Sequence, residues 1–162
     1  MINIKLKEIN WNNFWDIINL DVLDTQRNFL PSNAVFMAQA YVNIKLHYND
    51  ACFGIYNNDE LVGFTKIVFV EKMERIYNFN KDSYYIDALM IDKKFQGKGL
   101  GKAALNKILE FIKTEPWGKI HSIRTSCYDG NAVIKKLLKN LGFLETDTFI
   151  LNKKNLRLYI LE

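Results

Sequence analysis

The sequence predicts a single α/β domain of the α+β type over residues 1–162, with about seven strands and about four helices. Two observations carry this prediction. Apolar residues alternate with polar ones, or run continuously, in short stretches typical of strands, and elsewhere they recur at helical spacing. In addition, a glycine-rich stretch, residues 96–101, joins a strand pattern to a long helix pattern. The length suits one hydrophobic core, and no repeat or linker divides the chain.

The composition is that of an ordinary soluble globular protein, with 49% apolar and 25% charged residues. The formal net charge of +4 is mild and the lysines are scattered, so nucleic acid is not an expected partner, whereas an anionic cofactor is compatible. No apolar run approaches the roughly 20 residues of a membrane span, and the N-terminus lacks the apolar region of a signal peptide. Cys52 and Cys127 are expected to be buried, reduced thiols. We therefore expect a cytoplasmic protein.

The N-terminal third is predicted to contain a strand and two helices. Residues 2–6 alternate between apolar and polar, which is typical of a strand. Asn10 or Asn12 is expected to cap a helix over residues 14–22, because apolar positions recur there at helical spacing. A second helix is expected over residues 35–44, after a break at a proline and a serine.

A meander of strands follows. The strand patterns at 51–56 and 60–70 flank the turn sequence at 57–59, and Gly63 indicates a bulge or a close contact within the second strand. Residues 71–82 are polar and are predicted to form an exposed connection. The remaining elements are expected at residues 84–91 (strand), 102–115 (helix), 120–127 (strand), 131–140 (helix), 143–150 (strand) and 156–161 (strand).

The strand at 84–91 carries an unusual residue. Strict alternation would place Asp87 on one face with Tyr85, Leu89 and Ile91. Burying a carboxylate in an apolar strand is unfavourable unless it is paired or hydrogen-bonded. Asp87 is therefore expected either to bond to neighbouring backbone or a lysine, or to serve the chemistry of a site.

The glycine-rich stretch is expected to bind a phosphate or pyrophosphate. Gly97, Gly99 and Gly101 lack a Cβ, so the backbone can turn with positive φ and bring N–H groups close to an anion. The N-terminus of the following helix adds unpaired N–H groups and the positive end of its dipole. Lys98 and Lys102 would add positive charge.

The spacing of these glycines fits neither the dinucleotide fingerprint nor the P-loop. It fits Q/R-x-x-G-x-G/A, with Gln96, Gly99 and Gly101, and so resembles the pyrophosphate loop of the GNAT acetyltransferase superfamily. A second family signature, N-x-x-A-x-x-L-Y-x-x-x-G-F, is matched in part by Asn131, Leu137, Gly142 and Phe143. The order of predicted elements is also that of the superfamily.

This resemblance implies a GNAT fold, with a central mixed, mostly antiparallel sheet and helices on both of its faces. It implies acetyl-CoA as cosubstrate and no metal; His47 and His121 also lack partners at ligand spacing. The residues that would cradle the pyrophosphate are Gln96, Gly97, Lys98, Gly99, Leu100, Gly101 and Lys102. Backbone of Leu89, Met90 and Ile91 would pair with the pantetheine arm, and Asn131 would bond the same arm unless it only caps its helix.

The catalytic residues are less clear from the resemblance. The tyrosine that commonly protonates the departing thiolate is replaced by Leu138, and Tyr128 is the nearest substitute, unless it is only an aromatic lid over the turn. Asp87 is expected to face the amine to be acetylated and to assist its deprotonation. The alternative acids are Glu71, Glu74 and Asp82, which are otherwise solvated. Ser126 and Cys127 have no base positioned in sequence, which favours direct transfer over a covalent acetyl-enzyme.

The expected acceptor is a small polyamine or diamine. Residues 26–41 and the stretch at 87–92 resemble bacterial spermine/spermidine acetyltransferases. The net positive charge argues against long-range steering of a polycation, so local acids would have to compensate. Another small amine, an aminoglycoside or a protein amino group are alternative acceptors, and a non-enzymatic acyl-CoA-binding module is an alternative of another class. The sequence is compatible with a homodimer and does not decide the oligomeric state.

Overall fold

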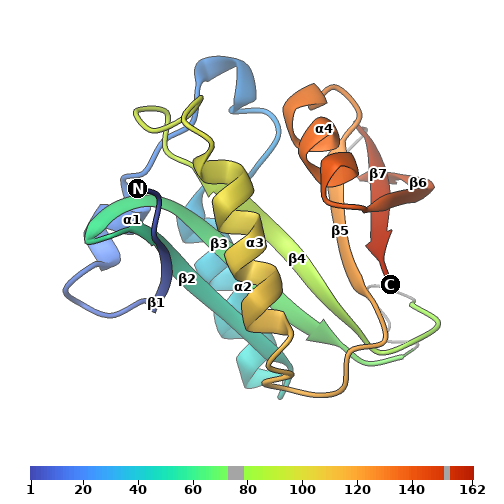
Figure 1. The fold of residues 1–162 in the computed structure, drawn as a ribbon. Helices are drawn as coiled ribbons and strands as arrows, with labels where there is room; N and C mark the ends of the chain where they lie inside the picture. Colours follow the sequence, from blue (N-terminus) through green and yellow to red (C-terminus); the bar gives the residue numbers. More distant parts are fainter. Residues whose placement is uncertain (73–78, 152–153) are drawn as a thin grey trace.

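A computed structural model of the protein describes residues 1–72, 79–151 and 154–162 (Figure 1). Its elements follow the predicted order. They are β1 (Ile4–Glu8), α1 (Phe14–Ile18), the 3-10 turn η1 (Asp24–Gln26), α2 (Asn33–Lys45), β2 (Asn49–Asn57), β3 (Glu60–Val70), β4 (Ser83–Ile91), α3 (Leu100–Ile112), β5 (Ile123–Tyr128), α4 (Ala132–Asn140), β6 (Leu144–Leu151) and β7 (Lys154–Leu161).

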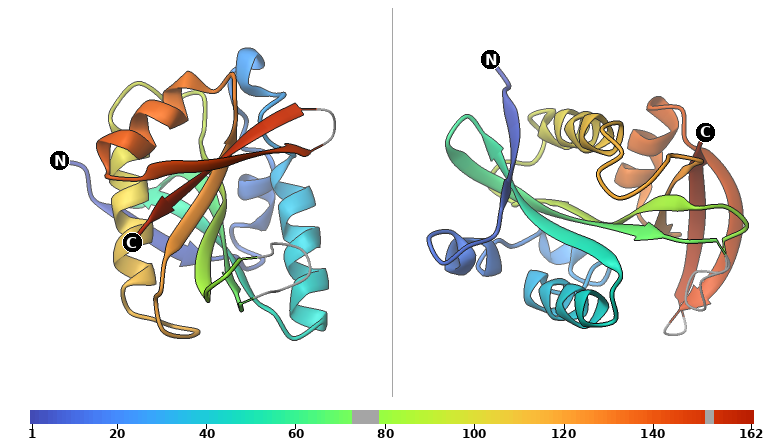
Figure 2. Two further views of the ribbon diagram at one scale, coloured as in Figure 1. Left: turned by 90° about the vertical axis from the view of Figure 1, so that its right-hand side faces the viewer. Right: turned by 90° about the horizontal axis from the view of Figure 1, so that it is seen from below.

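The strands form one seven-stranded sheet in the order β1-β2-β3-β4-β5-β7-β6. Every neighbouring pair is antiparallel except β4 and β5, which run parallel. Helices α1 and α2 cover one face of the sheet, and α3 and α4 cover the other (Figure 2). The predicted mixed sheet with helices on both faces is therefore confirmed. Within the described ranges, no helix combines the length and the apolar character that crossing a membrane requires.

Helix α3 is fixed to the sheet by its apolar stripe. Leu105, Ile108 and Ile112 are almost completely buried and pack against apolar side chains from the central strands and from α4. A second cluster on the opposite face joins Ile17 of α1 and Phe36 of α2 to the sheet. Because both faces of the central strands are covered, β3 and β4 read as nearly continuous apolar runs.

The first helix differs from its prediction. It spans only Phe14–Ile18, and its N-cap position is Asn13 rather than Asn10 or Asn12. The side chain of Asn13 is used for the preceding turn, since its Oδ1 accepts a hydrogen bond from Asn10 N and its Nδ2 donates to Glu8 O. The helix ends at Ile18 instead of near residue 22, and the chain then runs as a long connection toward α2.

A bulge at Asp87 changes the predicted faces of β4. Lys66 of β3 pairs with Ala88, but the next residue of β3 pairs with Ile86, so Asp87 has no opposite residue on β3. An extra residue in one strand exchanges the two faces beyond it. Ile86 and Leu89 consequently both pack under α3, and the predicted placement of Leu89 on one face with Tyr85 is wrong.

The parallel pair of β4 and β5 separates halfway. Pairing covers Tyr84 with Ile123, Tyr85 with Arg124 and Ile86 with Thr125, and ends there. Both strands continue, to Ile91 and to Tyr128, and diverge as Figure 1 shows. The far half of β4 is thus paired with β3 on one edge while its other edge faces the space between the two strands.

Candidate functional site

Two cavities lie where β4 and β5 diverge. The larger has a volume of about 260 Å³ and the smaller about 70 Å³. Both are bordered by Phe29 and Leu30 of the α1–α2 connection, by Leu89 of β4, and by Asn131 and Ile134 at the start of α4. The two cavities therefore adjoin, and chain segments far apart in sequence form their common wall.

The glycine-rich stretch lies along the larger cavity. Gly97 and Gly99 have φ angles of +77° and +79°, in the left-handed region that favours glycine. Gly99 is the N-cap of α3 and Gly101 lies in the first turn, so the helix begins two residues before the predicted start at Lys102. A Cβ on Gly97 would meet no atom within 4 Å. Backbone without side chains at the start of a 13-residue helix is a geometry suited to an anion.

Most of the residues predicted to bind the cofactor border this cavity. They are Leu89, Met90, Ile91, Gln96, Gly97, Gly99, Leu100, Gly101, Lys102 and Asn131. Lys98 does not border it: its Nζ donates to Lys94 O at 3.2 Å and lies over the ring of Phe95. The cation nearest the helix start along the cavity wall is instead Lys102.

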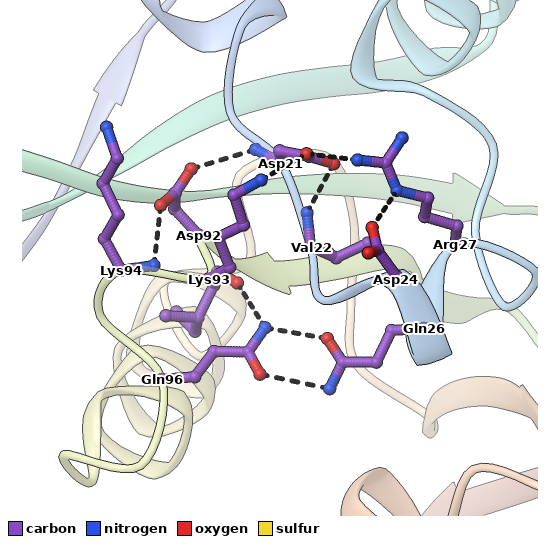
Figure 3. Close-up of polar contacts among 10 residues, drawn as sticks. Asp21, Val22, Asp24, Gln26, Arg27, Asp92, Lys93, Lys94 and Gln96 are labelled. Carbon is purple, nitrogen blue, oxygen red and sulfur yellow. Dashed lines mark hydrogen bonds and ion pairs between the residues drawn. The ribbon is translucent and has the colours of Figure 1, made fainter.

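The side chain of Gln96 is occupied by protein contacts. Its Nε2 donates to Ile91 O at 2.9 Å and to Gln26 Oε1 at 2.8 Å, while Gln26 Nε2 donates back to Gln96 Oε1 at 3.1 Å (Figure 3). This side chain therefore fixes the loop to β4 and to η1. Any contact of Gln96 with a cofactor would come from its backbone.

The α1–α2 connection is held to the start of the same loop by charged groups (Figure 3). The buried Asp92 accepts hydrogen bonds from Asp21 N and Lys94 N, both at 2.9 Å. Lys93 Nζ lies 2.8 Å from Asp21 Oδ2, and Arg27 pairs with the same oxygen at 2.7 Å. The hydrogen bond from Lys93 lowers the pKa of Asp21. These contacts place the connection beside the glycine-rich stretch.

Asn131 borders both cavities from the start of α4. Its Oδ1 accepts a hydrogen bond from Ile134 N at 3.3 Å, so it does cap the helix. The cap uses the oxygen of the side-chain amide and does not involve the two N–H donors of Nδ2. Capping and donation to a ligand are therefore compatible at this residue.

The smaller cavity contains both predicted catalytic residues. Asp87 and Tyr128 border it, together with Ser126, Cys127 and Leu138. Leu138 is 1% exposed and belongs to the core, so the position where the family commonly has tyrosine offers no proton donor. Tyr128 ends β5, and Lys154 Nζ lies 5.2 Å from the centre of its ring.

Asp87 is held by a lysine that sequence reasoning missed. Lys66 is 1% exposed, and its Nζ lies 2.6 Å from Asp87 Oδ2 and 3.1 Å from Asp50 Oδ2. A lysine inside an apolar strand is the same kind of anomaly as Asp87 itself, so the pattern at residues 60–70 did contain a signal. The prediction that Asp87 would need a partner holds, and that partner is Lys66.

The other candidate acids and nucleophiles are placed less favourably. Glu71 and Asp82 border neither cavity, and Asp82 accepts a hydrogen bond from Lys72 N; Glu74 lies outside the described residues. Burial raises the pKa of Cys127 to about 11 and that of Cys52 to about 12, so neither is a thiolate near neutral pH. Ser126 Oγ bonds to the hydroxyl of Tyr85 at 2.6 Å.

Comparisons with known proteins bear on the fold and on the family of this chain. Residues 14–143 match the family model described as the Acetyltransferase (GNAT) family. The chain is 30% identical over 144 residues to a probable spermine N(1)-acetyltransferase of Bacillus subtilis subsp. natto, covering 88% of each chain. It is similar in structure to the spermidine N-acetyltransferase of Vibrio cholerae in complex with CoA and spermine, with a TM-score of 0.71, 16% identity, and coverage of 98% and 94%. An aminoglycoside acetyltransferase in complex with coenzyme A gives a TM-score of 0.74 at 13% identity, with coverage of 98% and 94%.

Proposed function

The chain belongs to the acetyltransferase (GNAT) family, and on that premise we propose that it acetylates a primary amine of a polyamine or diamine such as spermidine or spermine. The enzyme class is that of an acyl-CoA-dependent N-acetyltransferase. The observation that carries the proposal is the meeting of two cavities at Leu89: one runs along the glycine-rich stretch and the other contains the carboxylate of Asp87.

The larger cavity fits coenzyme A in its chemistry. The bare backbone at Gly97 and the start of α3 suit the negatively charged pyrophosphate, and Lys102 adds a positive charge. The pantetheine arm carries amide groups, which suit the edge of β4 at Leu89 to Ile91 that β5 leaves unpaired. Asn131 Nδ2 is a further donor for the arm.

Asp87 is proposed to bind the amine and to assist loss of its proton, directly or through water. An alkylammonium has a pKa of about 10 and cannot attack the thioester until it is deprotonated. The carboxylate lies in the smaller cavity, adjoining the edge of β4 where the acetyl group would end. The amine nitrogen then forms a bond to the acetyl carbon, and the carbon–sulfur bond breaks. Backbone N–H groups at Leu89 to Ile91 would stabilise charge developing on the carbonyl oxygen.

The departing thiolate needs little assistance, because coenzyme A is a fairly good leaving group. Tyr128 is proposed to return a proton to the sulfur, because it borders the same cavity as Asp87. Leu138 has no proton to donate. Water is the alternative donor. The raised pKa of Cys127 supports direct transfer of the acetyl group rather than an acetylated thiol.

Two features favour a polyamine over other amines. The Bacillus relative at 30% identity is a probable spermine N(1)-acetyltransferase, and the Vibrio structure contains spermine. Phe29 and Leu30 give the smaller cavity apolar walls for an alkyl chain, and Asp87 gives it a carboxylate for an ammonium group. The Bacillus relatives also support a bacterial enzyme, and a cytoplasmic location stays part of the proposal.

The test is turnover with a panel of acceptors. Release of free thiol from acetyl-CoA is measured with spermine, spermidine, putrescine, lysine peptides and aminoglycosides, each also in competition with spermidine. We expect the highest kcat/KM with a polyamine. A clear preference for peptides or aminoglycosides would change the acceptor. Stoichiometric binding of acetyl-CoA without amine-stimulated thiol release would favour the binding module instead.

A further inference from the structure

A buried group of three charged side chains stands behind the smaller cavity. Lys66 lies between Asp50 and Asp87, with exposed side-chain fractions of 1%, 0% and 20% respectively. Three neighbouring strands supply the group: β2 carries Asp50, β3 carries Lys66 and β4 carries Asp87. Burying unpaired charges is strongly unfavourable. Because this burial is costly and Asp87 borders the proposed amine site, we looked for a role of these charges in the reaction.

The bulge in β4 is what brings Asp87 to the lysine. Lys66 is opposite Ala88 in the sheet, and the extra residue beside Ala88 turns the Asp87 carboxylate toward Lys66 Nζ, which donates to its Oδ2 at 2.6 Å. The lysine is held from behind by Asp50 Oδ2 at 3.1 Å, and Asp50 also accepts a hydrogen bond from Asn43 of α2 at 2.7 Å. The carboxylate position is thus set by a chain of contacts that reaches from β4 to α2.

The lysine carries its charge at neutral pH. Burial alone would lower the pKa of Lys66, but the carboxylates of Asp87 and Asp50 outweigh burial and raise it. Burial raises the pKa of Asp50, against the opposing effects of Lys66 and Asn43. In the described part of the chain, Asp50 Oδ1 is buried without a hydrogen-bond partner. The contact of Asp50 with Lys66 therefore comes with the cost of desolvating the Asp50 carboxylate.

We infer that Lys66 is a positioning residue for the acetyl transfer: it fixes Asp87 Oδ2, so that Oδ1 is left to receive the amine. The inference rests on the proposed function of Asp87. It adds that Lys66 sets the position of the Asp87 carboxylate, and that Asp50 acts only through Lys66. A purely structural ion pair would not affect how activity depends on pH.

Other ionisable groups near Asp87 must be considered before a pH effect is assigned. Those facing it among the described residues are Lys66 of β3, Asp50 and Cys52 of β2, Tyr85 of β4, and Cys127 and Tyr128 of β5. Burial raises the pKa of Cys52 to about 12, of Cys127 to about 11, and of Tyr85. These three groups stay neutral between pH 5 and 8, so the variants that test the inference are made at Lys66 and Asp50.

The experiment compares the acid limb of the pH profile of kcat/KM, with spermidine as acceptor, in the parent enzyme and in three variants. Lys66→Met leaves the carboxylates of Asp50 and Asp87 without their shared cation and is the variant most prone to unfold. The double variant Asp50→Asn with Lys66→Met removes one charge of each sign and keeps the side-chain shapes. Lys107→Met is the control, because Lys107 forms an exposed ion pair with Glu110 on α3.

We expect the double variant to bind acetyl-CoA as the parent does, to have a lower kcat, and to show an acid limb displaced to higher pH. Loss of a nearby opposite charge raises the pKa of a carboxylate by about 1 to 3 units, and loss of the Asp50 charge offsets part of that rise. The Lys107 variant should match the parent. An active double variant with an unmoved limb would overturn the inference while leaving the proposed function intact. Absence of amine-stimulated thiol release in the parent enzyme would instead reject the proposed function.

A second variant covers failure of the double variant to fold. Lys66→Arg keeps the positive charge but moves the donating atoms, so the acid limb should stay near that of the parent while kcat falls by about 10-fold or more through misplacement of the carboxylate. Full parental kcat in Lys66→Arg would show that the position of the donor is unimportant and would contradict the inference.

Discussion

Gln26 and Gln96, 70 residues apart in sequence, bond to each other through both atoms of their side-chain amides, at 2.8 and 3.1 Å. Gln26 is the last residue of η1, and Gln96 opens the glycine-rich stretch. Since Gln96 also donates to Ile91 O, one amide joins the α1–α2 connection, the end of β4 and the loop beneath the larger cavity. The Gln26–Gln96 pair therefore links the glycine-rich stretch to the α1–α2 connection, which borders both proposed substrate sites.

Removing this link should weaken binding of both substrates. Gln26→Ala leaves Gln96 its bond to Ile91 O but removes the reciprocal pair. We expect a weaker acetyl-CoA affinity in calorimetry and a higher KM for spermidine, with a coupling energy of about 0.5–3 kcal/mol in a cycle with Gln96→Ala. Gln39→Ala, on the exposed side of α2, is the control. Additive effects of the two alanine substitutions would show that the pair is not a functional unit.

Substitution in the glycine-rich stretch should abolish binding of the cofactor. Gly99 has a φ of +79°, so a side chain there costs about 1–2 kcal/mol in backbone strain. A valine at Gly101 would extend beyond Ile91 and Leu137, each 3.9 Å from its Cβ position, along the cavity wall. We expect Gly99→Val and Gly101→Val to show no acetyl-CoA binding in calorimetry. Gly130→Ala, where the nearest atom is 3.7 Å from the new Cβ, should bind normally. Unchanged affinity in the loop variants would refute the assignment of this loop.

Asp87→Asn should separate catalysis from cofactor binding. We expect unchanged acetyl-CoA affinity and a kcat/KM lower by about 10²-fold or more, the effect typical of losing a general base. Part of this loss should be recovered as the pH rises toward about 10, where more of the amine is neutral. The controls are Glu71→Gln and Asp82→Asn, which should retain parental activity because neither residue borders a cavity. Retained activity with a lower Tm in Asp87→Asn would make this residue a structural partner of Lys66 only.

Tyr128→Phe tests the proton donor. The ring and its contact with Lys154 remain, and only the hydroxyl is removed. We expect kcat to fall, but by less than the roughly 10²-fold typical of losing a general acid, because the thiolate is a fairly good leaving group; acetyl-CoA affinity should be unchanged. Tyr41→Phe, with a tyrosine that is 63% exposed on α2, is the control. Parental kcat would identify Tyr128 as an aromatic lid and leave water as the proton source.

Cys127→Ala should preserve turnover. Burial raises the pKa of this thiol to about 11, so only a very small fraction is nucleophilic at neutral pH. We expect kcat within a few fold of the parent and no burst of thiol release when enzyme and acetyl-CoA are mixed without amine. Cys52→Ala is the matched control, since its pKa is raised to about 12 by the same cause. A stoichiometric burst that disappears in Cys127→Ala would establish a covalent acetyl-enzyme.

The element order and fold class were predictable because period, turn residues and glycines are local features of the chain. The short α1 was not, since the backbone just after it, at Asp21 N, donates to Asp92, 71 residues away, and the sequence does not show such a contact. The N-cap Asn13, where Asn10 or Asn12 was expected, is likewise fixed by its bonds to the preceding turn. The bulge at Asp87 was also hidden, because it depends on how β4 pairs with β3. Strict alternation therefore assigned the faces of β4 wrongly.

The site was predictable where one segment builds it and hidden where several meet. The family and the nature of its cosubstrate are confirmed; the roles of individual residues stay predictions. The glycine-rich stretch borders its cavity as expected, apart from Lys98. The contributions of Gln26 and Lys66 arise only from tertiary structure, although a lysine in an apolar strand could have been recognised by the reasoning applied to Asp87.

The early end of pairing between β4 and β5 also bears on aggregation. An unpaired strand edge attracts strands of other molecules, and proteins usually protect such edges with charges, bulges or covering segments. Here the free edge beyond Ile86 opens into an interior space of about 260 Å³, bounded by Phe29 and Leu30 on one side and by α4 on the other. Phe29, Leu30 and α4 therefore cover this unpaired edge of β4 and limit its pairing with strands of other molecules, while the cavity beside it leaves space for a small molecule.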